Sequence, residues 1–150
     1  LTLAAKHPFA RKLINSGRLS QPCTLAHSPL QTAGDAPLRP GSALIDAPLV
    51  GPAGDCWLLG EVQGQFILLA VGEITAPDLP GLARIGIDQS QEAYPCFQGK
   101  DGHAQRRYGS GFLYLLRPDG HVCAVFDRPD SAAIARAFDR ALDCAKGAAT

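Results

Sequence analysis

Three side chains that could carry protons lie close together in the stretch LLRPDGHVCAVF, at Arg117, Asp119 and His121. Histidine titrates near neutral pH, and a neighbouring carboxylate can orient its ring for proton transfer. Pro118 and Gly120 between them are the residue types that a tight turn requires, since proline fixes φ and glycine takes the left-handed position. The stretch is therefore predicted to be a β-hairpin with polar side chains at its turn, and no catalytic residue is assigned to it.

Cysteine is the second source of chemistry. The five cysteines are odd in number and widely spaced, which argues against a disulfide framework and favours free thiols in a reducing cytoplasm; they are Cys23, Cys56, Cys96, Cys123 and Cys144. Cys123 and His121 are predicted to share one face of a strand, as a core residue and a strand-edge polar group. One alternative stays open, a thiol enzyme that uses Cys56 or Cys96 and would show one unusually reactive thiol.

Metal and nucleotide sites are not expected. The four histidines are far apart and no two are spaced i, i+4; they are His7, His27, His103 and His121. No cysteine pair has zinc-finger spacing, and no G-x-G-x-x-G follows a predicted strand. The metal-binding and cofactor-binding residues of this chain are therefore predicted to be none.

Aromatic and basic residues give weaker signals. Arg106, Arg107 and Tyr108 could meet an anionic partner, although two adjacent arginines are more typical of a solvated face. Trp57, the only tryptophan, is predicted to anchor the packing between a linker and the sheet.

Composition narrows the class of protein. The 150 residues contain 14 basic and 14 acidic side chains with no long block of one sign, so binding to nucleic acid or to an anionic membrane is not expected. The longest apolar run, residues 66–71, is far too short to cross a bilayer, and no signal peptide is recognisable. A cytoplasmic protein is expected. Because the chain begins at Leu1 and contains no methionine, it is expected to be a processed chain or an excised fragment.

The elements that would position these residues follow from the pattern. A short helix is predicted over residues 8–16, then an extended proline-rich linker to residue 52, and one or two helical turns from Asp55. Strands are predicted at 65–72, buried and central, and at 83–88, with too short a connection for a full crossover helix to be expected. Residues 89–111 are predicted to be a long polar surface loop before the hairpin, and residues 131–147 an amphipathic helix.

This order predicts an α/β fold with a thioredoxin-like mixed sheet and a C-terminal amphipathic helix, preceded by the short helix and the linker. Redox activity in such a fold needs a Cys-x-x-Cys after the central strand, where Gly72, Glu73, Ile74 and Thr75 stand instead. The proline expected before the third strand is also replaced, by residues 109–111, Gly-Ser-Gly. Dithiol–disulfide exchange is therefore not expected.

Three stretches together resemble a known family. HPFARKLINSGRLS, WLLGEVQGQFILLAVG and GFLYLLRPDGHVCAVF are similar to the C-terminal region of FAD-dependent aromatic hydroxylases of the phenol hydroxylase and 3-(3-hydroxyphenyl)propionate hydroxylase type. The resemblance implies that residues 1–20 end a flavin and substrate domain, that 21–52 are a linker, and that 53–150 are a thioredoxin-like domain without redox cysteines.

The resemblance also implies a function. The parent enzyme would hydroxylate an aromatic ring with FAD, NAD(P)H and O2, and this fragment would bind no cofactor and have no catalytic residue. Its partner would be the flavin domain of the same polypeptide, with a role in subunit association, stability or shielding of the active site. The alternative from another class is a free-standing, redox-inactive thioredoxin-like module that binds a protein or peptide.

Overall fold

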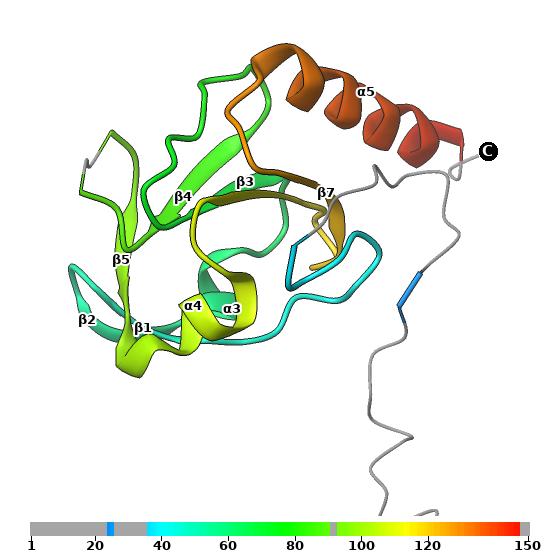
Figure 1. Cartoon of the computed structure of the whole chain (residues 1–150). Coiled ribbons are helices and arrows are strands. Elements are labelled where there is room, and N and C mark those ends of the chain that lie inside the picture. The colour runs from blue at the N-terminus through cyan, green and yellow to red at the C-terminus, as the bar shows by residue number, and fades with distance from the viewer. Residues whose placement is uncertain (1–23, 26–35, 91–92, 148–150) are drawn as a thin grey trace, which may run out of the picture.

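The computed structural model describes residues 24–25, 36–90 and 93–147 (Figure 1). The helix predicted at 8–16 and the predicted domain remnant 1–20 lie outside these residues. The described elements are β1 (Pro48–Gly51), β2 (Gly54–Trp57), α3 (Leu58–Glu61), β3 (Ile67–Val71), β4 (Ala83–Ile87), β5 (Cys96–Gly99), the 3-10 turn η2 (Lys100–Gly102), α4 (His103–Tyr108), β6 (Phe112–Leu116), β7 (Val122–Phe126) and α5 (Ser131–Gly147).

The strands of the described part form one mixed sheet in the order β2-β1-β5-β4-β3-β6-β7. Strand β3 lies inside it, parallel to β4 and antiparallel to β6, and all five of its residues are buried. An uninterrupted apolar run is what a strand covered on both faces requires. The parallel pair, the antiparallel hairpin β6–β7 and the terminal helix make the core thioredoxin-like, as predicted.

Each face of the sheet has its own core. Helix α5 packs on one face through its apolar stripe, which includes Ile134, Ala137, Phe138 and Ala141. Helices α3 and α4 and the segment from Ala36 to Leu49 cover the other face, on the opposite side of the sheet from α5 (Figure 1). The amphipathic helix predicted over 131–147 is confirmed.

The connection between the parallel strands β3 and β4, residues 72–82, contains no helix, as its length and two prolines predicted. The structure differs from the prediction after β4. Residues 89–111 are not one surface loop, because they contain β5, η2 and α4, whose buried side chains include Phe97, Ala104 and Tyr108. These elements are short and interrupted by glycines, so their periodicity in the sequence is weak.

Two boundaries near the start of the sheet also differ. Residues 54–57 pair with β1 as a strand, so the helix predicted from Asp55 begins only at Leu58. The proline-rich stretch predicted as linker to residue 52 contributes β1 to the sheet, and Pro48 fits there as the first residue of its strand. The division into three domains stays a prediction.

The hairpin predicted around residues 117–120 is confirmed, with one change of detail. A β-bulge interrupts the register, because Leu115 pairs with Ala124 and Leu116 with Val122, which leaves Cys123 as the extra residue. Val122 therefore faces one core, and both Cys123 and Ala124 face the other. The predicted strict alternation of side chains from His121 to Val125 is therefore wrong.

In the described part no helix has the length and apolar character needed to span a membrane.

Candidate functional site

In a thioredoxin-like fold the redox motif would follow the central strand, which is β3 here. The segment after β3 begins with a glycine. Gly72 has a φ of +75° and donates its N–H to the carbonyl oxygen of Ile87 at 2.9 Å. The N–H of Gly111 bonds to the carbonyl of Val71 at 2.7 Å, so the segment before β6 lies directly against this turn. A Cβ on Gly72 would collide with Ser110. The turn therefore has no room for a side chain at position 72 unless Ser110 moves.

The segment that follows Gly72 is held by a pair of side chains that we call the Gln89–Tyr94 clamp. The amide nitrogen of Gln89 donates to the carbonyl oxygens of Gly72 and of Ile74, the latter at 2.9 Å. The hydroxyl of Tyr94 donates to the Gln89 amide oxygen and accepts the N–H of Ala76, each at 3.0 Å. Backbone groups that a crossover helix would pair internally are therefore paired by side chains.

The clamp extends to Arg84. Its guanidinium lies 5.1 Å from the centre of the Tyr94 ring and 3.3 Å from the Asp78 carboxylate. Burial of Tyr94 raises the pKa of its hydroxyl, which keeps it a hydrogen-bond donor across the neutral range. Gly86 leaves the space for the clamp, because a Cβ there would lie 2.7 Å from Gln89 Cγ and from Cys96 Sγ.

Replacing Tyr94 with phenylalanine is expected to lower the free energy of unfolding by about 1–3 kcal/mol, because the buried N–H of Ala76 loses its acceptor. Urea denaturation measures this difference, and amide exchange should accelerate at Ala76. The matched control is Ser90→Ala, which removes an exposed hydrogen bond to Glu73 and should change stability by less than about 0.5 kcal/mol. Equal stability of the two variants would contradict a structural role for the clamp.

None of the described cysteines lies at this position. Cys123 is buried, which raises the pKa of its thiol to about 12. Cys56 is half-buried, and burial followed by the negative charge of Glu61 raises its thiol pKa as well. Since the thiolate is the nucleophile, a raised pKa opposes the thiol-enzyme alternative for Cys56. Cys96 is half-buried, and its Sγ packs close beside Gly86.

Thiol labelling tests that alternative. In folded protein near neutral pH, iodoacetamide is expected to modify Cys56 more slowly than in urea-unfolded protein, and Cys123 only as the chain unfolds. Peptide mapping by mass spectrometry follows each cysteine separately. A single cysteine that reacts faster in the folded than in the unfolded chain would identify a reactive thiol and contradict this expectation.

The geometry of the hairpin turn explains why Arg117, Asp119 and His121 lie close together. Asp119 pairs with Arg117 at 2.7 Å and accepts the backbone N–H of His121 at 3.2 Å. The N–H of Gly120 closes the turn by bonding to the carbonyl of Arg117 at 2.9 Å. The three side chains thus gather at the turn, as predicted, and their contacts stabilise its backbone.

Arg106 and Tyr108 do not form one solvent-facing site, because only Arg106 is exposed. Tyr108 is fully buried, and its hydroxyl donates to the carbonyl oxygen of Ile45. Arg106 is exposed and donates to the carbonyl of Asp101 at 2.9 Å. Among the described residues, no group of three or more histidine, cysteine or acidic side chains could hold a metal ion.

Trp57 is not the packing anchor that the sequence predicted, because 58% of its surface is exposed. It pairs with Pro48 on the outer face of the β1–β2 hairpin, whereas the neighbouring Leu49 points into the core. The alternation of a strand decides which side chain is buried, and the sequence alone did not show which side faces the sheet's core.

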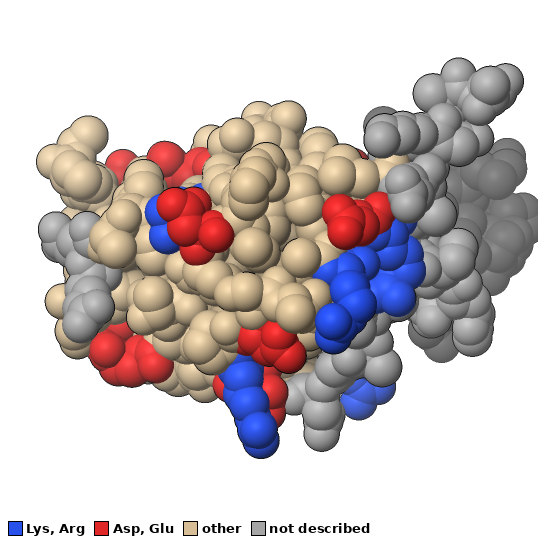
Figure 2. All heavy atoms as spheres, turned by 90° about the horizontal axis from the view of Figure 1, so that it is seen from above, with Lys and Arg blue, Asp and Glu red and all other residues tan. Residues whose placement is uncertain are grey.

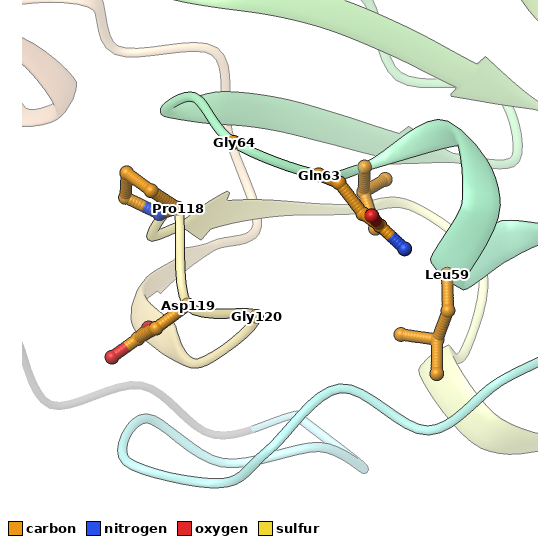
Figure 3. A pocket seen from close by; sticks show the side chains of 7 residues that line it. Leu59, Gln63, Gly64, Pro118, Asp119 and Gly120 are labelled. Atoms are coloured by element: carbon orange, nitrogen blue, oxygen red, sulfur yellow. The ribbon is translucent and has the colours of Figure 1, made fainter.

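Two shallow grooves accompany these features. One, of about 400 Å³, lies between α3 and the β6–β7 turn (Figure 3); it is lined by Leu59, Val62, Gln63, Gly64, Pro118, Asp119 and Gly120. The other, of about 520 Å³, runs past Arg84 and Tyr94 beside the clamp.

On the face that carries α5, acidic and basic side chains lie in small mixed groups with uncharged surface between them (Figure 2). The described residues visible on that face form no extended surface of one charge.

Comparison with known proteins finds likeness in structure only. No family model matches the chain, and no curated protein matches it. A ternary complex of aklavinone-11 hydroxylase with FAD and aklavinone is similar over 78% of this chain, with a TM-score of 0.60 and 19% identity. The flavin-dependent monooxygenase PieE, in complex with FAD and substrate, is similar over 71%, with a TM-score of 0.51 and 21% identity. This chain spans 26% and 21% of those two chains, so its fold occurs as a part of flavin-dependent monooxygenases.

Proposed function

We propose that this chain is the non-catalytic, C-terminal thioredoxin-like domain of an FAD-dependent monooxygenase that hydroxylates an aromatic compound with NAD(P)H and O2. The finer assignment is to the phenol hydroxylase and 3-(3-hydroxyphenyl)propionate hydroxylase type. The observation that carries the proposal is the Gln89–Tyr94 clamp, since it occupies the place where a thioredoxin-like protein needs its dithiol. The likeness to parts of two flavin-dependent monooxygenases supports it.

The division of labour follows from the same site. Burial raises the pKa of the thiols of Cys56 and Cys123, and we assign the flavin and nicotinamide chemistry to the preceding part of the polypeptide. The role proposed for this domain is association, stability or shielding of the active site. Its partner would be the flavin domain of the same polypeptide.

The coding region upstream of Leu1 tests the proposal. It is expected to continue in frame into a region with a dinucleotide-binding fingerprint, G-x-G-x-x-G after a strand. The purified 150-residue chain is expected to be colourless and to bind no added FAD, measured by visible absorbance after desalting. A start codon directly before Leu1, or an upstream region without the fingerprint, would favour the free-standing binding module instead.

A further inference from the structure

The parallel strands β4 and β5 pair over only a short distance. Strand β4 pairs with β5 at Gly86 and Ile87, so its first three residues, 83–85, have no partner in β5. The same three residues pair with β3 on their other side, and β4 stands between β5 and β3 in the sheet. In Figure 1 β4 and β5 diverge from the end at which they pair. The sheet therefore has an unpaired stretch in its interior.

The backbone of Arg84 points toward this unpaired stretch. The N–H groups of Gly86 and Asp88 bond to the carbonyl oxygens of Pro95 and Phe97, each at 2.9 Å. Successive residues of a strand direct their backbone N–H and C=O groups to opposite sides, toward alternate neighbouring strands. Because Arg84 lies two residues before Gly86, its own N–H and C=O are directed to the same side as those of Gly86.

Pro95 explains why the hydrogen-bond ladder stops at this point. In a regular parallel ladder the carbonyl of Arg84 would accept the N–H of residue 95, and its N–H would donate to the carbonyl of residue 93. Residue 95 is a proline and has no N–H to donate. No backbone bond joins the Arg84 N–H to Ala93, and within the described residues Arg84 thus presents a donor and an acceptor that lack strand partners.

The groove of about 520 Å³ lies between the diverging strands, and Arg84 is part of its lining. Its volume is within the range of roughly 300–1,000 Å³ that is usual for ligand pockets. Its apolar lining comes from Leu82, Ile85, Tyr94 and Phe97, which the domain itself already buries almost completely. An occupant therefore gains more from backbone hydrogen bonds than from apolar contact, and an extended peptide supplies such bonds.

The charges of the lining favour a basic side chain in the occupant. The guanidinium of Arg84 lies 3.3 Å from the carboxylate of Asp78, so these two charges compensate each other. Glu61 is the remaining charged residue of the lining, is exposed, and forms no ion pair with another described residue. A lysine or arginine in a bound peptide would complement its charge.

We infer that the groove between β4 and β5 binds an extended peptide segment, which pairs with the backbone of Arg84 and directs a basic side chain toward Glu61. The groove lies between two strands of one sheet, so a single extended segment fits it, whereas the edge strand of a second folded copy would bring its own neighbouring strand. This binding function goes beyond the role proposed for the domain in a monooxygenase and does not depend on it.

Peptide selection with the 150-residue chain tests the inference. The probe is a phage-displayed library of random linear twelve-residue peptides. The selected peptides are expected to be enriched in lysine or arginine beside β-branched residues, which favour the extended conformation. In hydrogen exchange followed by NMR, a saturating selected peptide should slow the Arg84 amide on the order of tenfold, because that amide gains an acceptor. The Gly86 amide, already bonded to Pro95, should change less.

Two matched pairs of variants locate the binding. Ala93→Trp fills the groove from an exposed position of its lining and should weaken binding on the order of tenfold. Ala132→Trp, at an exposed position on α5, should leave the affinity unchanged. Glu61→Gln should weaken binding of a basic peptide about two- to fivefold, the usual effect of an exposed ion pair. Glu73→Gln, exposed and outside the lining, should not.

Several results would overturn the inference. These are a selection without enrichment, selected peptides that bind the Ala93→Trp variant as tightly as the unaltered chain, and an Arg84 amide whose exchange the peptide does not slow. A dimer of the unaltered chain in sedimentation equilibrium that Ala93→Trp dissociates would assign the groove to a second copy and would also overturn it. Circular dichroism of each variant checks that the domain has kept its fold.

Discussion

Replacing Tyr108 with alanine is expected to lower the free energy of unfolding by about 3–5 kcal/mol, the cost of deleting a large buried aromatic side chain. Tyr108 is fully buried, and its ring packs edge-on against Tyr114 at 5.5 Å between centroids. Its hydroxyl donates to the carbonyl of Ile45 and so holds the segment before β1 against the sheet. Small domains have total stabilities of about 5–15 kcal/mol, so this loss should be large in urea denaturation.

Two companion variants separate the causes. Tyr108→Phe keeps the ring and removes only the hydrogen bond to Ile45, with an expected cost of about 1 kcal/mol. Arg106→Ala, two residues away on the exposed side of α4, should stay within about 0.5 kcal/mol of the unaltered chain. A cost below about 1 kcal/mol for Tyr108→Ala would contradict the packing of α4 and favour the surface loop that the sequence predicted there.

Tyr108 also shows why the sequence prediction was wrong for residues 89–111. Only a few apolar side chains in this stretch reach the core, among them Phe97, Ala104 and Tyr108, and polar residues and glycines separate them. The turn between β5 and α4 needs positive φ at Asp101 and Gly102 and breaks any helical period. Burial of these side chains depends on strand β1, which pairs with β5, contacts α4 and is remote in sequence.

The elements that were predicted correctly are those whose local sequence pattern alone determines their structure. Strand β3 is a continuous run of five apolar residues, and α5 has a stripe at helical spacing that begins after Asp130. Asp130 caps that helix by accepting the N–H groups of Ala132 and Ala133 at 3.0 Å. Such local patterns need no knowledge of the rest of the fold.

The candidate site also has a part that the sequence predicts and a part that depends on contacts between distant residues. The missing redox motif after Val71 is visible in the sequence, because it concerns four consecutive residues. The Gln89–Tyr94 clamp is not visible in the sequence, because Gln89 bonds to a carbonyl 17 residues earlier and Tyr94 to an N–H 18 residues earlier. Trp57 illustrates a third case, in which the residue was singled out but its side of the sheet depended on the register of β1 and β2.

Alkaline pH is expected to unfold the domain through its buried tyrosines. All three tyrosines of the chain are buried, and burial raises the pKa of each above its ordinary value of 10.0, to about 12 for Tyr114. A raised pKa in the folded state means that the stability from a neutral, buried hydroxyl is complete below pH 10 and is lost as the pH rises toward the folded value. Cys123, with its thiol pKa raised from 9.0 to about 12, adds a loss that begins one pH unit lower.

The loss of stability at alkaline pH is the sum of the contributions of the buried tyrosine hydroxyls and the Cys123 thiol. Each such group removes about 1.4 kcal/mol of stability per pH unit between its unfolded and folded pKa values. Urea denaturation at a series of pH values should show a flat stability below pH 9 and a progressively steeper fall above pH 10. The ultraviolet absorbance of tyrosinate should stay low in the folded chain and rise for all three tyrosines together as it unfolds.

Tyr114→Phe provides the matched variant for this prediction. It loses the hydrogen bond from the Tyr114 hydroxyl to the carbonyl of Tyr108, so its stability at neutral pH should fall by about 1 kcal/mol. It also has one buried hydroxyl fewer to ionise, so its stability should fall less steeply between pH 10 and pH 12 than that of the unaltered chain. A tyrosine that titrates near pH 10 in the folded chain would show that its ring is open to solvent, and parallel curves for the two proteins would show that Tyr114 does not contribute to the alkaline transition.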